Sequence, residues 1–170
     1  MNFKILIVSG VIASALSAVA VPVAQAAGLE RKMGQNATGL CNAMAPAQEA
    51  TLRKFPLGLK NVGTTAQPIA CSMPGDARGG GNTLVAINIS SELNTAVDVN
   101  CTLVDGDLVV GATFFPKSVN LAAGAKASIS WTPAEFALTR FRARDNINCS
   151  LPAGVTMSLV EWTFNQDVLR

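Results

Sequence analysis

Two runs of alternating apolar and polar residues constrain the fold of this chain more than any other feature. Residues 84–89 and 97–104 each repeat with a period of two, and a short polar loop separates them. Because successive side chains of a β-strand point to opposite faces, each run has one apolar face and one polar face. The pattern predicts an antiparallel hairpin with one buried face, which the rest of the chain must cover.

The inward-facing positions of the two runs are aliphatic except for one cysteine: Val85, Ile87, Ile89, Val97, Val99, Cys101 and Leu103. A second hairpin is predicted from the alternation over 54–60 and 69–73, with a turn at 61–64. Further short runs occupy 108–115, 126–131, 139–144, 146–151 and 155–164. Asp105-Gly106-Asp107 is typical of a tight turn, and Pro116 is expected to end the run before it.

Counted together, these runs give about eight strands separated by turn residues. Only short helical turns are expected, at 46–54 and 132–135. This spacing predicts an all-β fold, a Greek-key (immunoglobulin-like) antiparallel β-sandwich.

The first 26 residues have the pattern of a signal peptide. A short start with Lys4 precedes an apolar run over 5–23, and Ala24-Gln25-Ala26 provides small residues for cleavage after Ala26. The apolar run is long enough for a membrane anchor, but its serines and small-residue end favour a cleaved leader. We therefore expect a signal peptide over 1–26, an irregular N-terminal arm over 27–50 and the β-sandwich over 51–170. The mature protein is expected to be periplasmic or secreted and not membrane-spanning.

Charge and composition exclude several classes of function. Without Lys4 the chain has 12 basic and 11 acidic residues, so its charge gives no reason to expect nucleic acid as a partner. Histidine and tyrosine are absent. A Ser-His-Asp triad, an imidazole metal ligand and a histidine pH switch are therefore excluded, and no cofactor or metal is implied.

Four cysteines lie in the mature part: Cys41, Cys71, Cys101 and Cys149. An even number in an exported chain predicts two disulfides, and the lack of a C-x-x-C pair and of histidine argues against zinc. Three pairings are open. We expect Cys101 to pair with Cys149 across the core, since both lie mid-pattern on inward positions. Cys41 would then join Cys71 and attach the arm to the predicted second hairpin.

Two groups of residues resemble known proteins. Asn88-x-Ser90, Val99-x-Cys101-x-Leu103-x-Asp105-Gly106, Ser118-Val119-x-Leu121-Ala122-x-Gly124 and Ile129-x-Trp131 together resemble bacterial immunoglobulin-like sandwich modules. Leu57-Gly58-Leu59-x-Asn61-x-Gly63-Thr64 with Cys71-Ser72-Met73-Pro74, Val99-Asn100-Cys101-Thr102-Leu103 and Cys149-Ser150-Leu151-Pro152 is similar to short exported proteobacterial proteins of unassigned function. The resemblance implies a fold and assigns no catalytic residue.

Arg140, Arg142 and Arg144 alternate in the run over 139–144. On a strand they would project from one face about 7 Å apart, and guanidinium groups suit phosphate and carboxylate. They are a possible anion-binding site for lipopolysaccharide, an acidic surface polysaccharide or an acidic envelope protein. The alternative is a solvated strand face paired with Asp145 or Glu161.

Two weaker candidates concern acidic and aromatic residues. Asp105 and Asp107, with Asp98 or Asp76, could ligate calcium or act as a glycosidase pair, although Asp-Gly-Asp is ordinary turn chemistry. Trp131, Trp162 and Phe164 could form a platform for sugar, although aromatic residues at alternating strand positions usually fill a core.

The function that fits these features is a non-enzymatic, disulfide-stabilised domain that binds or has a structural role in the cell envelope. A fimbrial-type structural subunit is the alternative, but such subunits usually end in an alternating strand with an aromatic residue next to last, and this chain ends Asp167-Val168-Leu169-Arg170. A carboxylate-based hydrolase has the least support, since histidine is absent.

Cleavage after Ala26 can be tested directly on exported protein. Intact-mass measurement should give a chain that begins at Ala27, because the Ala24-Gln25-Ala26 site fits signal peptidase. A mass that still includes residues 1–26 would contradict the prediction.

Overall fold

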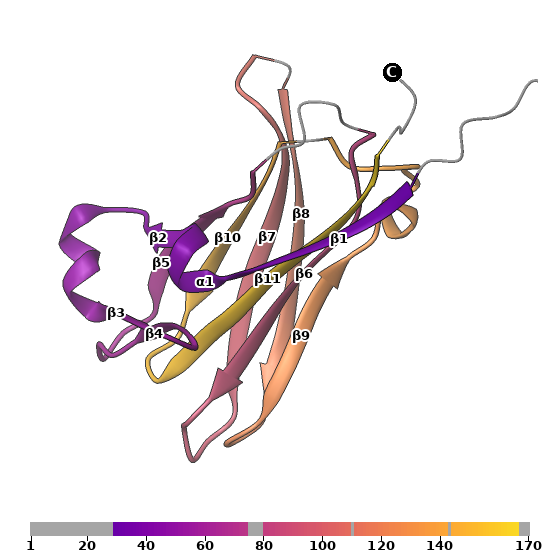
Figure 1. The fold of residues 1–170 in the computed structure, drawn as a ribbon. Helices are drawn as coiled ribbons and strands as arrows, with labels where there is room; N and C mark the ends of the chain where they lie inside the picture. Colours follow the sequence, from indigo (N-terminus) through magenta and orange to yellow (C-terminus); the bar gives the residue numbers. More distant parts are fainter. Residues whose placement is uncertain (1–28, 75–79, 110, 143, 167–170) are drawn as a thin grey trace, which may run out of the picture.

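A computed structural model describes residues 29–74, 80–109, 111–142 and 144–166. The predicted signal peptide lies outside the described residues. The described chain forms two antiparallel β-sheets that face each other and run along the length of the molecule (Figure 1). None of its helices is long and apolar enough to cross a membrane.

Sheet A consists of six strands. Its order is β3 (Leu52–Phe55), β4 (Gly58–Asn61), β11 (Val155–Gln166), β6 (Asn82–Ser91) and β9 (Lys126–Trp131), and β1 (Leu29–Asn36) also pairs with β11. Sheet B has the order β2 (Cys41–Ala43), β5 (Gln67–Ser72), β10 (Asp145–Leu151), β7 (Val97–Asp107) and β8 (Gly111–Leu121).

Strands that follow each other in the chain mostly alternate between the sheets. From β4 to β11 only the step from β7 to β8 stays within one sheet, which is the arrangement of a jelly roll built from two Greek keys. The predicted all-β Greek-key antiparallel sandwich is confirmed. The eleven strands among the described residues exceed the expected eight, because several are short edge strands.

The predicted hairpin of residues 84–89 and 97–104 is wrong. The first run lies in β6 of sheet A and the second in β7 of sheet B, so the two strands face each other across the core. The predicted hairpin of 54–60 and 69–73 fails for the same reason, since β4 and β5 lie in different sheets. Alternation identifies the buried face of a strand, and it is equally satisfied by strands that pair and by strands that face each other.

Two predicted strand ends also differ from the structure. Asp105-Gly106-Asp107 belongs to β7, and the chain turns later, where Leu108 and Val109 are exposed. Pro116 does not break its strand but lies within β8. Because β8 is an edge strand of sheet B, a residue without an N–H group is tolerated there.

The N-terminal arm is more regular than expected. Residues 27–50 include β1, the short helix α1 (Ala37–Leu40), β2 and most of a 3-10 turn (Pro46–Thr51). Asn36 caps α1, since its side-chain oxygen accepts a hydrogen bond from the Thr38 N–H at 2.9 Å. A second 3-10 turn, Pro133–Phe136, occurs where a helical turn was predicted.

The apolar faces of the two sheets form one core. The largest fully buried side chains come from both sheets and from the 139–144 segment: Trp131, Phe141, Leu59, Ile69, Ile87, Ile89, Leu103, Leu121, Ile147, Leu151, Met157 and Val85. Trp131 of β9 donates its indole N–H to the Phe115 carbonyl of β8 at 2.8 Å, so the largest core side chain is also hydrogen-bonded across the sandwich.

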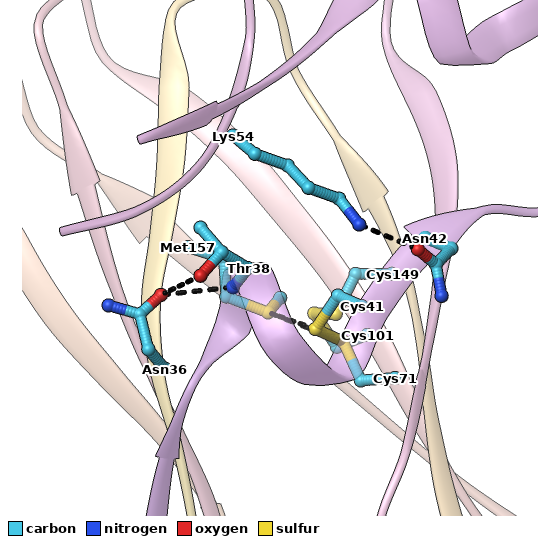
Figure 2. Close-up of a disulfide and its surroundings, with 9 residues drawn as sticks. All are labelled: Asn36, Thr38, Cys41, Asn42, Lys54, Cys71, Cys101, Cys149 and Met157. Carbon is cyan, nitrogen blue, oxygen red and sulfur yellow. Dashed lines mark hydrogen bonds between the residues drawn. A yellow bond between two sulfur atoms is a disulfide. The ribbon is translucent and has the colours of Figure 1, made fainter. Parts of the chain in front are cut away.

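Both predicted disulfides are confirmed, Cys41–Cys71 and Cys101–Cys149. Neither connects the two sheets, because each joins directly opposed residues of neighbouring strands in sheet B. The Cys41–Cys71 bond packs across the core against Met157 of sheet A (Figure 2). The Met157 sulfur lies 3.8 Å from Cys41 Sγ and 3.6 Å from Cys71 Sγ.

The two disulfides should contribute similarly to stability. They close loops with sequence separations of 30 and 48, for which chain entropy gives about 4 kcal/mol each, and all four cysteines are buried. We expect the C41A/C71A and C101A/C149A variants to lose comparable free energy of unfolding in denaturant titrations. A negligible loss for C41A/C71A would show that the N-terminal region unfolds independently of the core.

Candidate functional site

Four outward-facing side chains line up across sheet A. The register places Lys60 of β4 opposite Thr156 of β11, Thr156 opposite Ser90 of β6, and Ser90 opposite Lys126 of β9. Neighbouring strands lie about 4.8 Å apart, so this row extends roughly 14 Å across the strands. It places two hydroxyl groups between two ammonium groups.

A β-bulge in β11 adds a second polar row next to the first. The register shifts between Met157 and Leu159, which turns Ser158 to the outer face while Met157 and Val160 both stay buried. The Ser158 hydroxyl donates to the Asn88 carbonyl at 3.1 Å, and Ser128 donates to the Ile87 carbonyl at 3.1 Å. Each hydroxyl retains acceptor lone pairs toward the outer face.

The β3–β4 turn forms an apolar wall beside these rows. Phe55 and Leu57 are exposed at its tip, and the Asn36 amide donates to the Pro56 carbonyl at 2.8 Å, which fixes the turn to the start of α1. Gly58 permits a close approach to β11, because a Cβ atom there would lie 2.4 Å from the Met157 carbonyl oxygen.

Turn and sheet together enclose an open groove of about 1130 Å³. Its lining combines the three apolar residues of the turn with hydroxyl, amide and charged side chains: Phe55, Pro56, Leu57, Lys60, Asn88, Ser90, Glu92, Lys126, Ser128, Thr156 and Ser158. The groove therefore offers hydrogen-bonding groups on its floor and an apolar surface along one side.

The groove carries a net positive charge. Lys60 forms an ion pair with Glu92, whereas no ion pair of Lys126 occurs within the described part of the chain. Among the described residues that line the groove, Glu92 is the single acid. Lys126 is thus available to a carboxylate or sulfate group of a ligand.

The structure corrects the predicted arginine ladder. Arg140, Arg142 and Arg144 lie in an irregular segment between the Pro133–Phe136 turn and β10, because Phe141 is drawn into the core with Phe115 and Phe136. Arg142 donates to the Gly111 carbonyl, and Arg144 forms an ion pair with Asp107 at 3.1 Å. All three remain exposed, and anion binding by them stays a prediction.

The acidic residues predicted as a calcium or glycosidase site and the aromatic residues predicted as a sugar platform lie away from the groove. Trp131 and Trp162 are buried in the core and cannot form a sugar platform at the surface. Asp98 accepts a hydrogen bond from Asn120 at 2.7 Å on the exposed face of β7, whereas Asp105 is buried. Asp76 lies outside the described residues. Over the described ranges, no three Asp, Glu, Cys or His side chains form a group that could hold a metal ion.

Sequence reasoning did not find the groove. Its floor comes from strands that are far apart in the chain, and the outward polar positions carry no motif. The available signal was the polar side of each alternating run, but which positions become neighbours depends on the strand order. The bulge that exposes Ser158 gave no sequence signal either.

No protein-family model and no curated protein matches the chain. Among solved structures, a xylan-binding module named CBM15 aligns at 12% identity with a TM-score of 0.48, over 83% of this chain and 99% of that one. The C-terminal CBM6 of LamC, a marine laminarinase from Zobellia galactanivorans, aligns at 10% identity and TM-score 0.37, over 79% and 99%. A disulfide-linked pilus subunit of Bacillus endospore appendages aligns at 12% identity and TM-score 0.32, over 85% and 96%. These similarities concern the fold alone.

Gly58 should be essential for the wall of the groove. Gly58→Ala is expected to destabilise the protein by roughly 2 kcal/mol, since the added methyl group meets the Met157 backbone oxygen, which cannot rotate away. Gly34→Ala in β1 is the control, because its added Cβ would have no neighbour closer than 3.7 Å. Equal unfolding midpoints for the two variants in denaturant would contradict the close packing of turn and sheet.

Proposed function

We propose that this protein is a non-catalytic binding domain that holds an acidic polysaccharide in the groove on sheet A. The row Lys60, Thr156, Ser90 and Lys126 is the observation that carries this proposal. An extended chain of sugars presents hydroxyl groups at every ring and, in acidic polysaccharides, carboxylate or sulfate groups at intervals. A floor of hydroxyl groups between two lysines complements both.

The apolar wall supports the same class of ligand. Sugar rings have C–H faces that pack against apolar side chains, and Leu57 is 81% exposed beside the polar floor. Burial of such surface adds affinity, while the hydroxyl and ammonium groups determine orientation. The groove is open at its surface, as binding within a long chain requires.

A binding role agrees better with the groove than hydrolysis does. Glycoside hydrolysis requires two carboxyl groups on either side of the scissile bond, and in the described lining only Glu92 is acidic. Glu92 is also held in an ion pair with Lys60. The buried Asp105 and Asp145, at 5% and 1% exposure, are out of reach of a polysaccharide.

The place of action is part of the proposal. Two disulfides and no free cysteine among the described residues fit an oxidising compartment. Together with the predicted leader, they support a site of action in the periplasm or outside the cell, where acidic surface polysaccharides occur.

Affinity electrophoresis in gels with polygalacturonate or with neutral xylan tests the ligand class. The protein should be retarded by polygalacturonate more than by xylan. Lys126→Ala should weaken this affinity roughly tenfold, the value of one charge-assisted hydrogen bond, and Thr156→Val should weaken it less.

Arg140→Ala is the matched control, since it removes an exposed positive charge outside the groove. Retardation should be unchanged in this variant. If retardation instead survives Lys126→Ala and is lost in the triple variant of Arg140, Arg142 and Arg144, the anion site lies at the arginines and the groove is not the binding site.

A further inference from the structure

Two buried carboxyl groups face each other at the end of β6 opposite the groove. Asp105 of β7 and Asp145 of β10 are direct cross-strand partners in sheet B. Asp145 is 1% exposed and Asp105 is 5% exposed. Two like charges placed side by side without water repel each other strongly, so this arrangement requires a compensating positive charge or a proton.

The immediate partners of the pair are neutral. Asp105 Oδ1 accepts a hydrogen bond from the Arg142 backbone N–H at 2.7 Å, and Asp145 Oδ2 accepts one from the Asn82 side-chain amide at 2.6 Å. The second oxygen of Asp145, Oδ1, has no hydrogen-bond partner among the described residues. In the described chain, neither carboxylate forms an ion pair.

The charged groups on the surrounding elements are engaged elsewhere or exposed. On β7, Asp107 pairs with Arg144, and the Arg142 guanidinium donates to the Gly111 carbonyl next to Gly106. Arg140 is exposed. The strands β5 and β6 contain no titratable residue. On β8, where Thr113 lies opposite Asp105, the titratable residue is Lys117, which forms an ion pair with Glu135.

Burial therefore raises the pKa of Asp145 to about 7. The neighbouring Asp105 carboxyl group raises this pKa further, whereas the hydrogen bond from Asn82 lowers it. At mildly acidic pH Asp145 therefore holds a proton.

The pair also connects the two sheets. Asn82 belongs to β6 of sheet A and Asp145 to β10 of sheet B, so their hydrogen bond crosses the sandwich. The Asn82 carbonyl accepts a hydrogen bond from the Phe141 N–H at 2.9 Å, and the Phe141 ring lies 5.5 Å from that of Phe115 in the core. Repulsion at the pair would thus act on a contact between the sheets.

We propose that Asp105, Asp145 and Asn82 form a pH-sensitive clasp between the sheets, closed when Asp145 is protonated and weakened when Asp145 ionises beside Asp105. The clasp is a conformational device separate from the groove. Its sign is opposite to that of an ordinary surface carboxylate in an ion pair, which loses its contribution in acid.

The sign follows from linkage. The pKa of Asp145 in the folded state lies above its ordinary value of 3.8, so the folded state binds more protons between these two pH values. The contribution of the clasp is complete below about pH 4, declines as pH rises and is lost above about pH 7. The protein should be more stable at pH 5 than at pH 8.

Thermal unfolding at pH 5 and pH 8 tests the clasp. The melting temperature of the unmodified protein should be lower at pH 8 by roughly 5 °C. Asp145→Asn, which has the same shape and no charge, should remove most of this difference. Asp98→Asn is the matched control, since it removes an exposed carboxylate from the same strand as Asp105 and should keep the difference.

A second variant and an NMR titration test the clasp if Asp145→Asn does not fold. Asp105→Asn should also flatten the pH dependence, and a ¹³C NMR titration of the unmodified protein should show one aspartate carboxyl group that titrates near pH 7. No such group, or an unchanged pH dependence in both folded variants, would overturn the proposal. The proposal would also be overturned if calcium restored the melting temperature of the unmodified protein at pH 8 and had no such effect on Asp145→Asn. The carboxyl pair would then be a cation site.

Discussion

The apolar layer between the two sheets holds this sandwich together. Neither disulfide connects one sheet to the other. Cys41–Cys71 and Cys101–Cys149 both lie within sheet B and fix the register of its strands. No disulfide among the described residues joins sheet A to sheet B. Its position depends on burial of the side chains that both sheets turn inward and on a few polar contacts between the sheets.

Those polar contacts are spread over the sandwich. The Asn61 amide of β4 donates to the Leu151 carbonyl of β10 at 2.8 Å near one end, and Trp131 donates to the Phe115 carbonyl. Asn82 and Asp145 connect the sheets at the other end. Of these, only the last involves a titratable group, so the two ends of the sandwich respond differently to pH. The groove lies at the end whose contacts are neutral.

The alternation of apolar and polar residues predicts which face of each strand is buried. It does not predict which strands lie next to each other in a sheet. Val85, Ile87 and Ile89 were placed in the core correctly, and so were Cys101 and Leu103, because side-chain parity depends on the local backbone alone. Strand order depends on contacts between distant parts of the chain, which alternation does not encode. The disulfides were paired correctly, yet the expected bond across the core joins adjacent strands of one sheet.

The candidate site was even less predictable from the sequence, because it also depends on strand order. Lys60 and Lys126 are 66 positions apart in the sequence, and nothing in either segment indicates that Thr156 and Ser90 lie between them. Asp105 was assigned to a turn because Asp-Gly-Asp is a common turn sequence, and its burial next to Asp145 was not foreseen. In both cases, strand register brings together side chains that are far apart in the sequence.

The edges of the sheets bear on how this protein behaves at high concentration. An open strand edge can recruit further strands and start aggregation. Here β1 covers the exposed side of β11 while turning nearly all of its own side chains to solvent, and Glu30, Arg31 and Lys32 place three charges on this outer strand. Pro116 interrupts the donor row of the β8 edge in sheet B. Charges on β1 and a proline in β8 thus make strand addition between molecules unfavourable at these two edges.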